Sequence, residues 1–288
     1  MPLDIVRRLL TPILDPVATS RYPEEAPLLA PATRGLPEID PTLCADDAAC
    51  AAVCPTGAIE LGSAEAAGAG SADAGTWSID AGKCIFCGAC ALACPNGAIQ
   101  VSSRVELAAA DRAALVERSG APRTTPTPED RRRASIAGRF GRSLHVRHLD
   151  AGSCNGCDWE IAALLNPYHD IQRLGIDFVA SPRHADLLLV TGVMTHNLTE
   201  AARRTYEAMP EPRLVVAVGA CAISGGVFAG SPACASGVAG TLPVNVFVPG
   251  CPPRPEALIE GMLAAIEGSR AATAPDAAPA EPPAGADS

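Results

Sequence analysis

The segment that decides the fold runs from Cys84 to Ile99 and reads CIFCGACALACPNGAI. Forty residues earlier, Cys44 to Ile59 reads CADDAACAAVCPTGAI, with three cysteines, a proline and a Gly-Ala-Ile at the same positions. Self-similarity at a fixed offset is the signature of an internal repeat. The first part of the chain is therefore expected to consist of two similar halves.

The second copy has the spacing C-x2-C-x2-C-x3-C-P, formed by Cys84, Cys87, Cys90 and Cys94. This spacing is typical of bacterial two-cluster ferredoxins, in which the fourth cysteine of each run ligates the other cluster. It predicts a [4Fe-4S] cluster on Cys84, Cys87, Cys90 and Cys54. Zinc is the alternative metal, but zinc sites usually space two C-x2-C pairs well apart.

The partner cluster has one thiolate fewer. It would take Cys44, Cys50 and Cys94, and Asp47 stands where the second copy has Cys87. Either Asp47 gives a carboxylate oxygen to the fourth iron of a [4Fe-4S] cluster, or the cluster is [3Fe-4S] and Asp47 is a solvated loop residue. Because a carboxylate is a harder ligand than a thiolate, we expect this site to be labile.

Overall charge and cysteine usage limit the class of protein. The net charge of −10 argues against a nucleic-acid partner, which would require a basic excess. The first fifteen residues predict an amphipathic helix rather than a secretory signal. Together with the 12 cysteines, this indicates a reducing compartment and metal ligation rather than disulfides.

Beyond residue 143, short apolar runs alternate with helical stretches, which indicates a parallel sheet covered on both faces. We expect a flavodoxin-like α/β domain here, after an α+β ferredoxin domain. The candidate strands are Leu144 to Leu149, Ile176 to Ala180, Asp186 to Thr191, Leu214 to Val218 and Val244 to Val248. The candidate helices are Asp158 to Leu165, Thr199 to Met209 and Pro255 to Glu267.

A second group of cysteines, Cys154, Cys157, Cys221 and Cys251, falls in this α/β part. They follow predicted parallel strands, and open α/β sheets bind ligands at the carboxyl ends of their strands. The pattern predicts a further [4Fe-4S] cluster. The alternatives are scattered core cysteines or a thioredoxin-type redox pair. Cys234 is left over, and we expect an ordinary thiol there.

The predicted organisation has five parts. They are a docking segment (1–36), a two-cluster ferredoxin domain (37–102) with an Ala/Gly-rich insertion at 61–76, an arginine-rich linker (103–142), an α/β iron-sulfur domain (143–268) and a disordered tail (269–288).

Several motifs resemble a known family. Gly152-Ser-Cys154-Asn-Gly-Cys157-Asp-Trp-Glu160, Ser181-Pro-Arg-His-Ala-Asp186 and Val248-Pro-Gly-Cys251-Pro-Pro-Arg-Pro255 are similar to the small subunit of membrane-bound energy-converting [NiFe] hydrogenases, including the formate hydrogenlyase type. That subunit is related to the complex I subunit carrying the terminal cluster, which has two adjacent cysteines where this chain has Cys154-x2-Cys157. Arg21-Tyr22-Pro23 and Arg34-Gly35, with the cysteine repeat, resemble the polyferredoxin-like subunit of the same complexes. The chain thus looks like a fusion of two subunits.

The resemblance implies an electron-transfer role. The cluster on Cys154, Cys157, Cys221 and Cys251 would lie next to a nickel-iron centre in a separate large subunit. The other implied partners are membrane ion-translocating subunits and a soluble or subunit electron donor, with this chain peripheral on the cytoplasmic side of the cell membrane. Glu160 is a candidate proton relay, and a solvated carboxylate in the first helix turn is the alternative. The competing functions are a complex I-like dehydrogenase module without nickel and a zinc-stabilised interaction protein.

Overall fold

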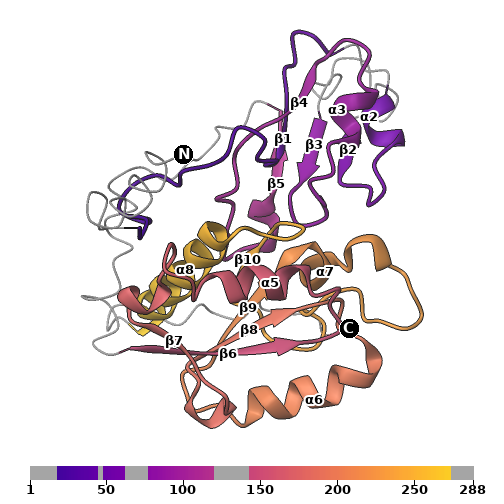
Figure 1. The fold of residues 1–288 in the computed structure, drawn as a ribbon. Coiled ribbons are helices and arrows are strands. Elements are labelled where there is room, and N and C mark those ends of the chain that lie inside the picture. The colour runs from indigo at the N-terminus through magenta and orange to yellow at the C-terminus, as the bar shows by residue number, and fades with distance from the viewer. Residues whose placement is uncertain (1–17, 45–47, 62–76, 120–142, 274–288) are drawn as a thin grey trace, which may run out of the picture.

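The computed structural model describes residues 18–44, 48–61, 77–119 and 143–273. They form a smaller domain that lies against a larger α/β domain (Figure 1). The predicted N-terminal helix, Asp47, nearly all of the Ala/Gly-rich insertion and the arginine-rich part of the predicted linker lie outside these residues.

The smaller domain contains the two halves predicted from the repeat. Its elements are β1 (Pro37–Ile39), α2 (Ala49–Ala52) and β2 (Ile59–Leu61), followed by β3 (Trp77–Asp80), α3 (Ala89–Ala93) and β4 (Ile99–Val101). The first strand of each half pairs antiparallel with the last strand of the other, β1 with β4 and β3 with β2. Because of this exchange, the cysteine that ends one half lies beside the cysteines that begin the other.

The start of the predicted linker is structured. Residues 112–118 form the 3-10 helix η1 (Arg112–Leu115) and the strand β5 (Val116–Arg118), which pairs with β3. Arg104 holds this segment to the domain, because its guanidinium donates to Glu117 at 2.7 Å and lies 3.4 Å from Glu38. The smaller domain therefore includes residues to at least 118.

The α/β domain is built on five parallel strands in the order β10-β9-β8-β6-β7. They are β6 (Leu144–Asp150), β7 (Ile176–Phe178), β8 (Leu187–Thr191), β9 (Leu214–Val218) and β10 (Val246–Val248). Numbered along the chain this is the order 2-1-3-4-5 of flavodoxin-like sheets. The predicted fold class is confirmed.

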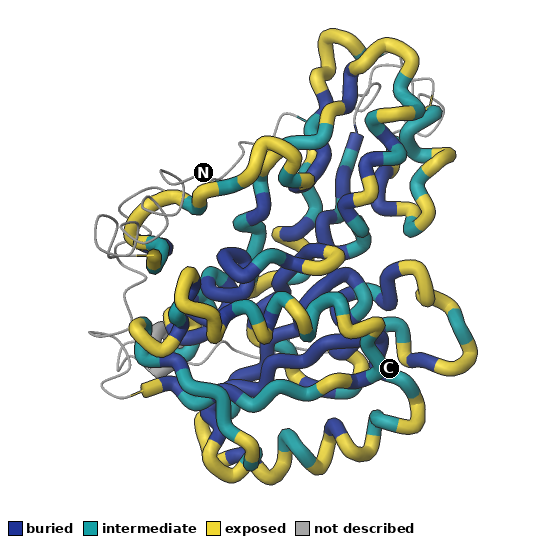
Figure 2. Tube along the Cα trace, in the orientation of Figure 1, coloured by how far each residue is buried: buried dark blue, intermediate teal, exposed yellow. Residues whose placement is uncertain are grey.

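Helices cover both faces of the sheet, with α5 and α8 on one face and α6 on the other (Figure 1). Alternate residues of β8 divide between the two faces, as the pleat requires. Figure 2 shows the central strands β8 and β9 as buried and the outer side of α6 as exposed. The bounds are α5 (Gly156–Ala163), α6 (His196–Glu207), α7 (Gly219–Ser224) and α8 (Pro255–Thr273), with 3-10 helices η3 (Ile171–Leu174), η4 (Pro182–His184) and η5 (Gly226–Phe228).

Two elements differ from the sequence-based expectation. α8 continues to Thr273, although the sequence predicts a disordered tail after residue 268. Cys221 is the third residue of the short helix α7, where the sequence predicts a loop. None of the helices in the described residues is long and apolar enough to cross a membrane.

The two domains share backbone hydrogen bonds and a core. Ala109 and Phe247 exchange hydrogen bonds of 3.0 and 2.8 Å, so the chain after β4 adds to the edge of the parallel sheet at β10. Ile79 of the smaller domain and Ile223 of α7 belong to one cluster of buried hydrophobic residues. The smaller domain is therefore fixed on the α/β domain by more than a chain connection.

Candidate iron-sulfur sites

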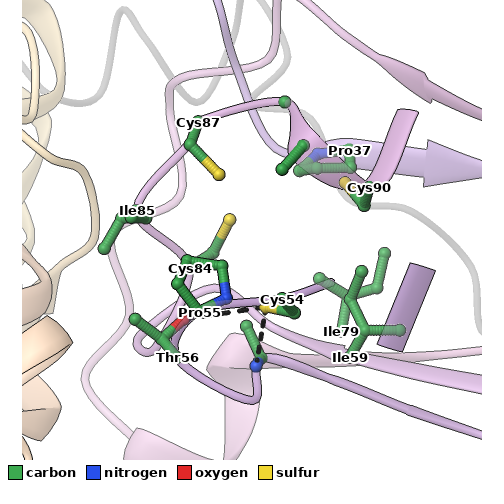
Figure 3. Close-up of a pocket in the computed structure, with 13 residues that line it drawn as sticks. Pro37, Cys54, Pro55, Thr56, Ile59, Ile79, Cys84, Ile85, Cys87 and Cys90 are labelled. Carbon is green, nitrogen blue, oxygen red and sulfur yellow. Dashed lines mark hydrogen bonds between the residues drawn. The ribbon is translucent and has the colours of Figure 1, made fainter. Parts of the chain in front are cut away.

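The first candidate site is a recess in the smaller domain, lined by Cys54, Cys84, Cys87 and Cys90. Its empty volume is about 350 Å³, part of it open to solvent. Figure 3 shows these cysteines around a common space, with Cys54 coming from the first half of the repeat and the other three from the second. The structure thus brings together the four cysteines that the crossing of the two halves predicted.

Backbone N–H groups already point at two of these sulfur atoms. Ala58 donates to Sγ of Cys54 at 3.3 Å, and Phe86 donates to Sγ of Cys84 at 3.4 Å. Hydrogen bonds to a thiolate favour its charged form, and groups that bond to metal ligands support those ligands in the same way. These two contacts would therefore stabilise thiolates once a positive charge is bound in the recess.

The pKa values of the cysteines in the recess show that ionised thiolates there need a compensating positive charge. Burial, together with the charges of neighbouring cysteines, raises the pKa of Cys84 from 9.0 to about 12 and that of Cys90 from 9.0 to about 11. Burial also acts to raise the pKa of Cys54, but hydrogen bonds from residues 56 to 59 outweigh it and the pKa is lowered. Crowded, buried thiolates need a compensating cation, and metal binding supplies it while releasing their protons.

The second candidate site contains the remaining three cysteines of the repeat. Burial raises the pKa of Cys50, and the charges of Cys44 and Cys94 act in the same direction. These three residues therefore lie close enough to interact, as the repeat predicted. Asp47, the proposed fourth ligand, lies outside the described residues.

The third candidate site lies at the carboxyl edge of the parallel sheet. Cys157 is in the first turn of α5, Cys221 is in α7, and Cys251 follows β10. Burial raises the pKa of Cys157, and the charges of Cys221, Cys251 and Cys154 raise it further. The four predicted cysteines converge here, one pair from the chain after β6 and one each from the chain after β9 and β10.

A glycine leaves the space that a cluster at this third site would need. Gly219 has φ +84°, and a Cβ atom built on it would lie 2.8 Å from Sγ of Cys157. Only glycine combines this backbone conformation with so close an approach. The next residue, Ala220, donates its N–H to the carbonyl oxygen of Gly250 at 2.9 Å, which fixes the Cys221 and Cys251 segments to each other. Four converging thiols, with no side chain at Gly219 beside them, fit a [4Fe-4S] cluster.

No group of three or more His, Cys, Asp or Glu side chains in the described residues could hold a single metal ion. A four-iron cluster spreads its thiolate ligands around a larger body than one ion. Cys234 is not one of the predicted ligands of the third site, although its charge adds to burial, as the smallest influence, in raising the pKa of Cys221. Cys234 is buried at 7% exposure, and its thiol donates to the carbonyl oxygen of Phe228 at 3.4 Å.

Glu160 belongs to a charged group that the sequence did not reveal. Burial raises its pKa, Arg254 acts to lower it, and Glu256 raises it. Glu256 is only 2% exposed, and its Oε2 lies 3.4 Å from Nε of Arg254. This group could have been predicted from the Arg-Pro-Glu that follows Cys251, because it places an arginine and a second carboxylate at the start of α8, which packs against α5. Glu160 is therefore half-buried between helices, and not a plainly solvated carboxylate.

Known proteins match both domains. Residues 154–265 match the family model described as NADH ubiquinone oxidoreductase, 20 Kd subunit, and residues 77–100 match the 4Fe-4S binding domain. These matches cover the third site and most of the second half of the repeat. The chain is thus an iron-sulfur protein.

Three relatives illustrate the range of complexes in this family. A probable membrane-bound hydrogenase subunit, mbhJ, of Pyrococcus furiosus is 49% identical over 138 residues, which cover 48% of this chain and 83% of that protein. Formate hydrogenlyase subunit 7 of Escherichia coli is 42% identical over 46% of this chain and 52% of its own length. An NADH-quinone oxidoreductase subunit of Desulfovibrio desulfuricans is 50% identical over 37% of this chain and 58% of its own length. The chain therefore belongs to the family of the NADH ubiquinone oxidoreductase 20 Kd subunit and its hydrogenase counterparts, as an iron-sulfur subunit of an oxidoreductase.

Proposed function

We propose that this chain carries electrons between ferredoxin-type clusters and a cluster next to the nickel-iron site of a hydrogenase large subunit. The observation that carries the proposal is the proximity of two of the candidate sites. Burial raises the pKa of Cys251 at the sheet edge, Cys154 raises it too, and Cys87 of the recess acts in the same direction. Thiols of the two sites, on different domains, therefore lie close enough to interact electrostatically.

Each site has a proposed ligand set. Cys54, Cys84, Cys87 and Cys90 would hold one [4Fe-4S] cluster, and Cys154, Cys157, Cys221 and Cys251 would hold the other, proximal one. Cys44, Cys50 and Cys94 would hold a third cluster, either [4Fe-4S] with Asp47 or [3Fe-4S]. Such clusters, when bound, accept and release one electron at a time.

The protein's own part in this transfer is to fix the sites. The hydroxyl of Ser224, three residues after Cys221, donates to the carbonyl oxygen of Gly82, two residues before Cys84. The reciprocal bonds between Ala109 and Phe247 hold the same two domains at β10. The Ala109–Phe247 pair joins backbone to backbone, and the Ser224–Gly82 bond joins a short side chain to backbone. Both contacts limit the movement of one domain relative to the other.

The choice of a nickel enzyme rests on the spacing Cys154-x2-Cys157, together with the resemblance to the probable hydrogenase subunit. The large subunit, the membrane ion-translocating subunits, an electron donor and a peripheral position on the cytoplasmic face of the membrane are proposed on the same ground. A second candidate is a complex I-like module without nickel, which the 50% identity to a subunit of an NADH-quinone oxidoreductase favours.

Purification of the native complex tests the proposal. We expect iron and acid-labile sulfide in this chain, nickel in a co-purifying subunit, and hydrogen evolution with a low-potential donor. Iron and sulfide without nickel or hydrogen activity would overturn the hydrogenase proposal in favour of the complex I-like one. Zinc without sulfide would overturn both, because a zinc site contains no inorganic sulfide.

A further inference from the structure

A polar network outside the thiols holds the loop that carries Cys154 and leads into Cys157 at the start of α5. We call residues 152–155 the cysteine loop. The carboxylate of Asp158 accepts hydrogen bonds from the hydroxyl of Ser153 at 2.6 Å and from the hydroxyl of Thr191 at 2.9 Å. Ser153 lies in the cysteine loop and Thr191 ends β8, so one carboxylate joins the loop to the neighbouring strand.

His148 of β6 is the third partner of this carboxylate. Its Nε2 lies 3.0 Å from Oδ1 of Asp158 and 3.0 Å from the Thr191 hydroxyl. Burial lowers the pKa of His148, and the opposing charges of Asp158 and Asp150 do not reverse this. The imidazole is therefore neutral near pH 7 and brings no positive charge to the Asp158 carboxylate.

This charge lies beside the third candidate site. Asp158 directly follows Cys157, and its side chain is 23% exposed. The charge of Asp158 is one of the influences that raise the pKa of Cys157, after burial and the three other thiols. The thiol of Cys157 and the carboxylate of Asp158 therefore share one partly buried region, where charges interact more strongly than in water.

We propose that Asp158 is a positioning residue for the proximal thiol group and that its charge lowers the reduction potential of the cluster held there. The inference rests on the proposed function. Reduction of a cluster held by the four cysteines of this group, with the ferredoxin-type cluster as electron donor, would form and break no bond and would add one unit of negative charge to the cluster. A fixed carboxylate opposes that added charge, and partners of this outer kind tune metal sites.

Two substitutions with opposite effects test this. Asp158→Asn removes the charge at constant shape, so the midpoint potential of the proximal cluster should rise. Thr191→Val removes a donor that partly neutralises the carboxylate, so the potential should fall. Asp177→Asn, on the far edge strand β7, should leave it unchanged. The measurement is a redox titration of the purified complex followed by electron paramagnetic resonance.

The outcomes are distinguishable. An unchanged potential in Asp158→Asn would overturn the role of Asp158. Shifts of the same sign in both variants would overturn it too, because they would indicate general damage to the loop rather than an effect of the charge. If Asp158→Asn loads no iron, the fall in potential expected for Thr191→Val still decides the matter. A wild-type complex without any proximal signal would overturn the proposed function itself, and with it this inference.

Discussion

The hydroxyl of Ser224 donates a 2.9 Å hydrogen bond to the carbonyl oxygen of Gly82 and so joins α7 to the turn before Cys84. Gly82 is held from the other side as well, because its N–H donates to Oδ1 of Asp80 at 2.9 Å. Arg112 binds both oxygens of the same Asp80 carboxylate, at 2.9 and 2.7 Å. The turn is therefore clamped between its own domain and the α/β domain.

Replacing Gly82 with valine should separate the two domains locally. A Cβ atom at this position would lie 2.8 Å from Cγ2 of Ile223 and 2.9 Å from Cζ of Arg112. Overpacking of this kind costs about 1–3 kcal/mol. We expect a lower free energy of unfolding in chemical denaturation and slower reduction of the proximal cluster in rapid-mixing experiments.

Ser224→Ala is the matched control for Gly82→Val. It removes the hydrogen bond to Gly82, and with it the local contacts of the same hydroxyl with Ala220 and Gly226, without adding volume. Each hydrogen bond lost costs about 0.5–1.5 kcal/mol. We expect a smaller loss of stability and a nearly unchanged transfer rate. Equal behaviour of Gly82→Val and the wild type would contradict the assigned interface.

Gly219→Ala should prevent loading of the proximal site. The residue would have to adopt φ +84° at a cost of about 1–2 kcal/mol, and its methyl group would displace Sγ of Cys157. Iron analysis after reconstitution should show about four irons fewer per chain. Gly240→Ala is the control, since a Cβ atom there would have no atom within 4 Å. Full iron content in Gly219→Ala would show that Gly219 does not border the cluster as we propose.

Cys221→Ser and Cys234→Ser should differ sharply. The first removes a proposed ligand, so the proximal signal in electron paramagnetic resonance and hydrogen-dependent activity should disappear while the ferredoxin-type signals remain. The second changes a buried thiol that donates to Phe228, and a serine hydroxyl can do the same. We expect it to keep all signals. Full activity of Cys221→Ser would rule out the ligand assignment.

Acid should destabilise the native protein through His169. Burial lowers its pKa below 6.5; Glu256 acts to raise it, and Arg254 and Arg173 add to the lowering. As the pH falls below 6.5, the unfolded chain takes up the proton first, and the native state loses stability until its own lowered pKa is passed. Nδ1 of His169 is buried without a hydrogen-bond partner, so the added charge would be poorly satisfied.

The measurement is the denaturation midpoint at pH 7.5 and at pH 5.5. His169→Gln should lose less stability between these two conditions than the wild type. His184→Gln, at an exposed position, should behave like the wild type. A wild-type midpoint that does not fall on acidification, or a fall of the same size in His169→Gln, would contradict the prediction.

The repeat and the parallel sheet could be predicted because both leave local patterns. Cysteines, proline and Gly-Ala-Ile recur at one offset, and continuous apolar runs such as Leu214–Val218 reproduce the observed strand. The segment after Val101 could not be predicted, because β5 and the Ala109–Phe247 pairing depend on partners elsewhere in the chain. Its prolines and arginines suggested a linker, and tertiary pairing prevailed for residues up to 118.

The sequence by itself predicts which cysteines belong together, since ligand spacing and the crossing of a two-fold repeat are properties of the chain. It also determined the family, through motifs of adjacent residues around Cys154 and Cys251. Only the tertiary structure decided how the groups lie relative to each other: Cys87 within electrostatic reach of Cys251, Ser224 bonded to Gly82, and Asp158 bonded to Thr191. The physical reason is that spacing along a chain fixes which groups can share a cluster, whereas relative position and local charge arise only when separate domains and strands pack.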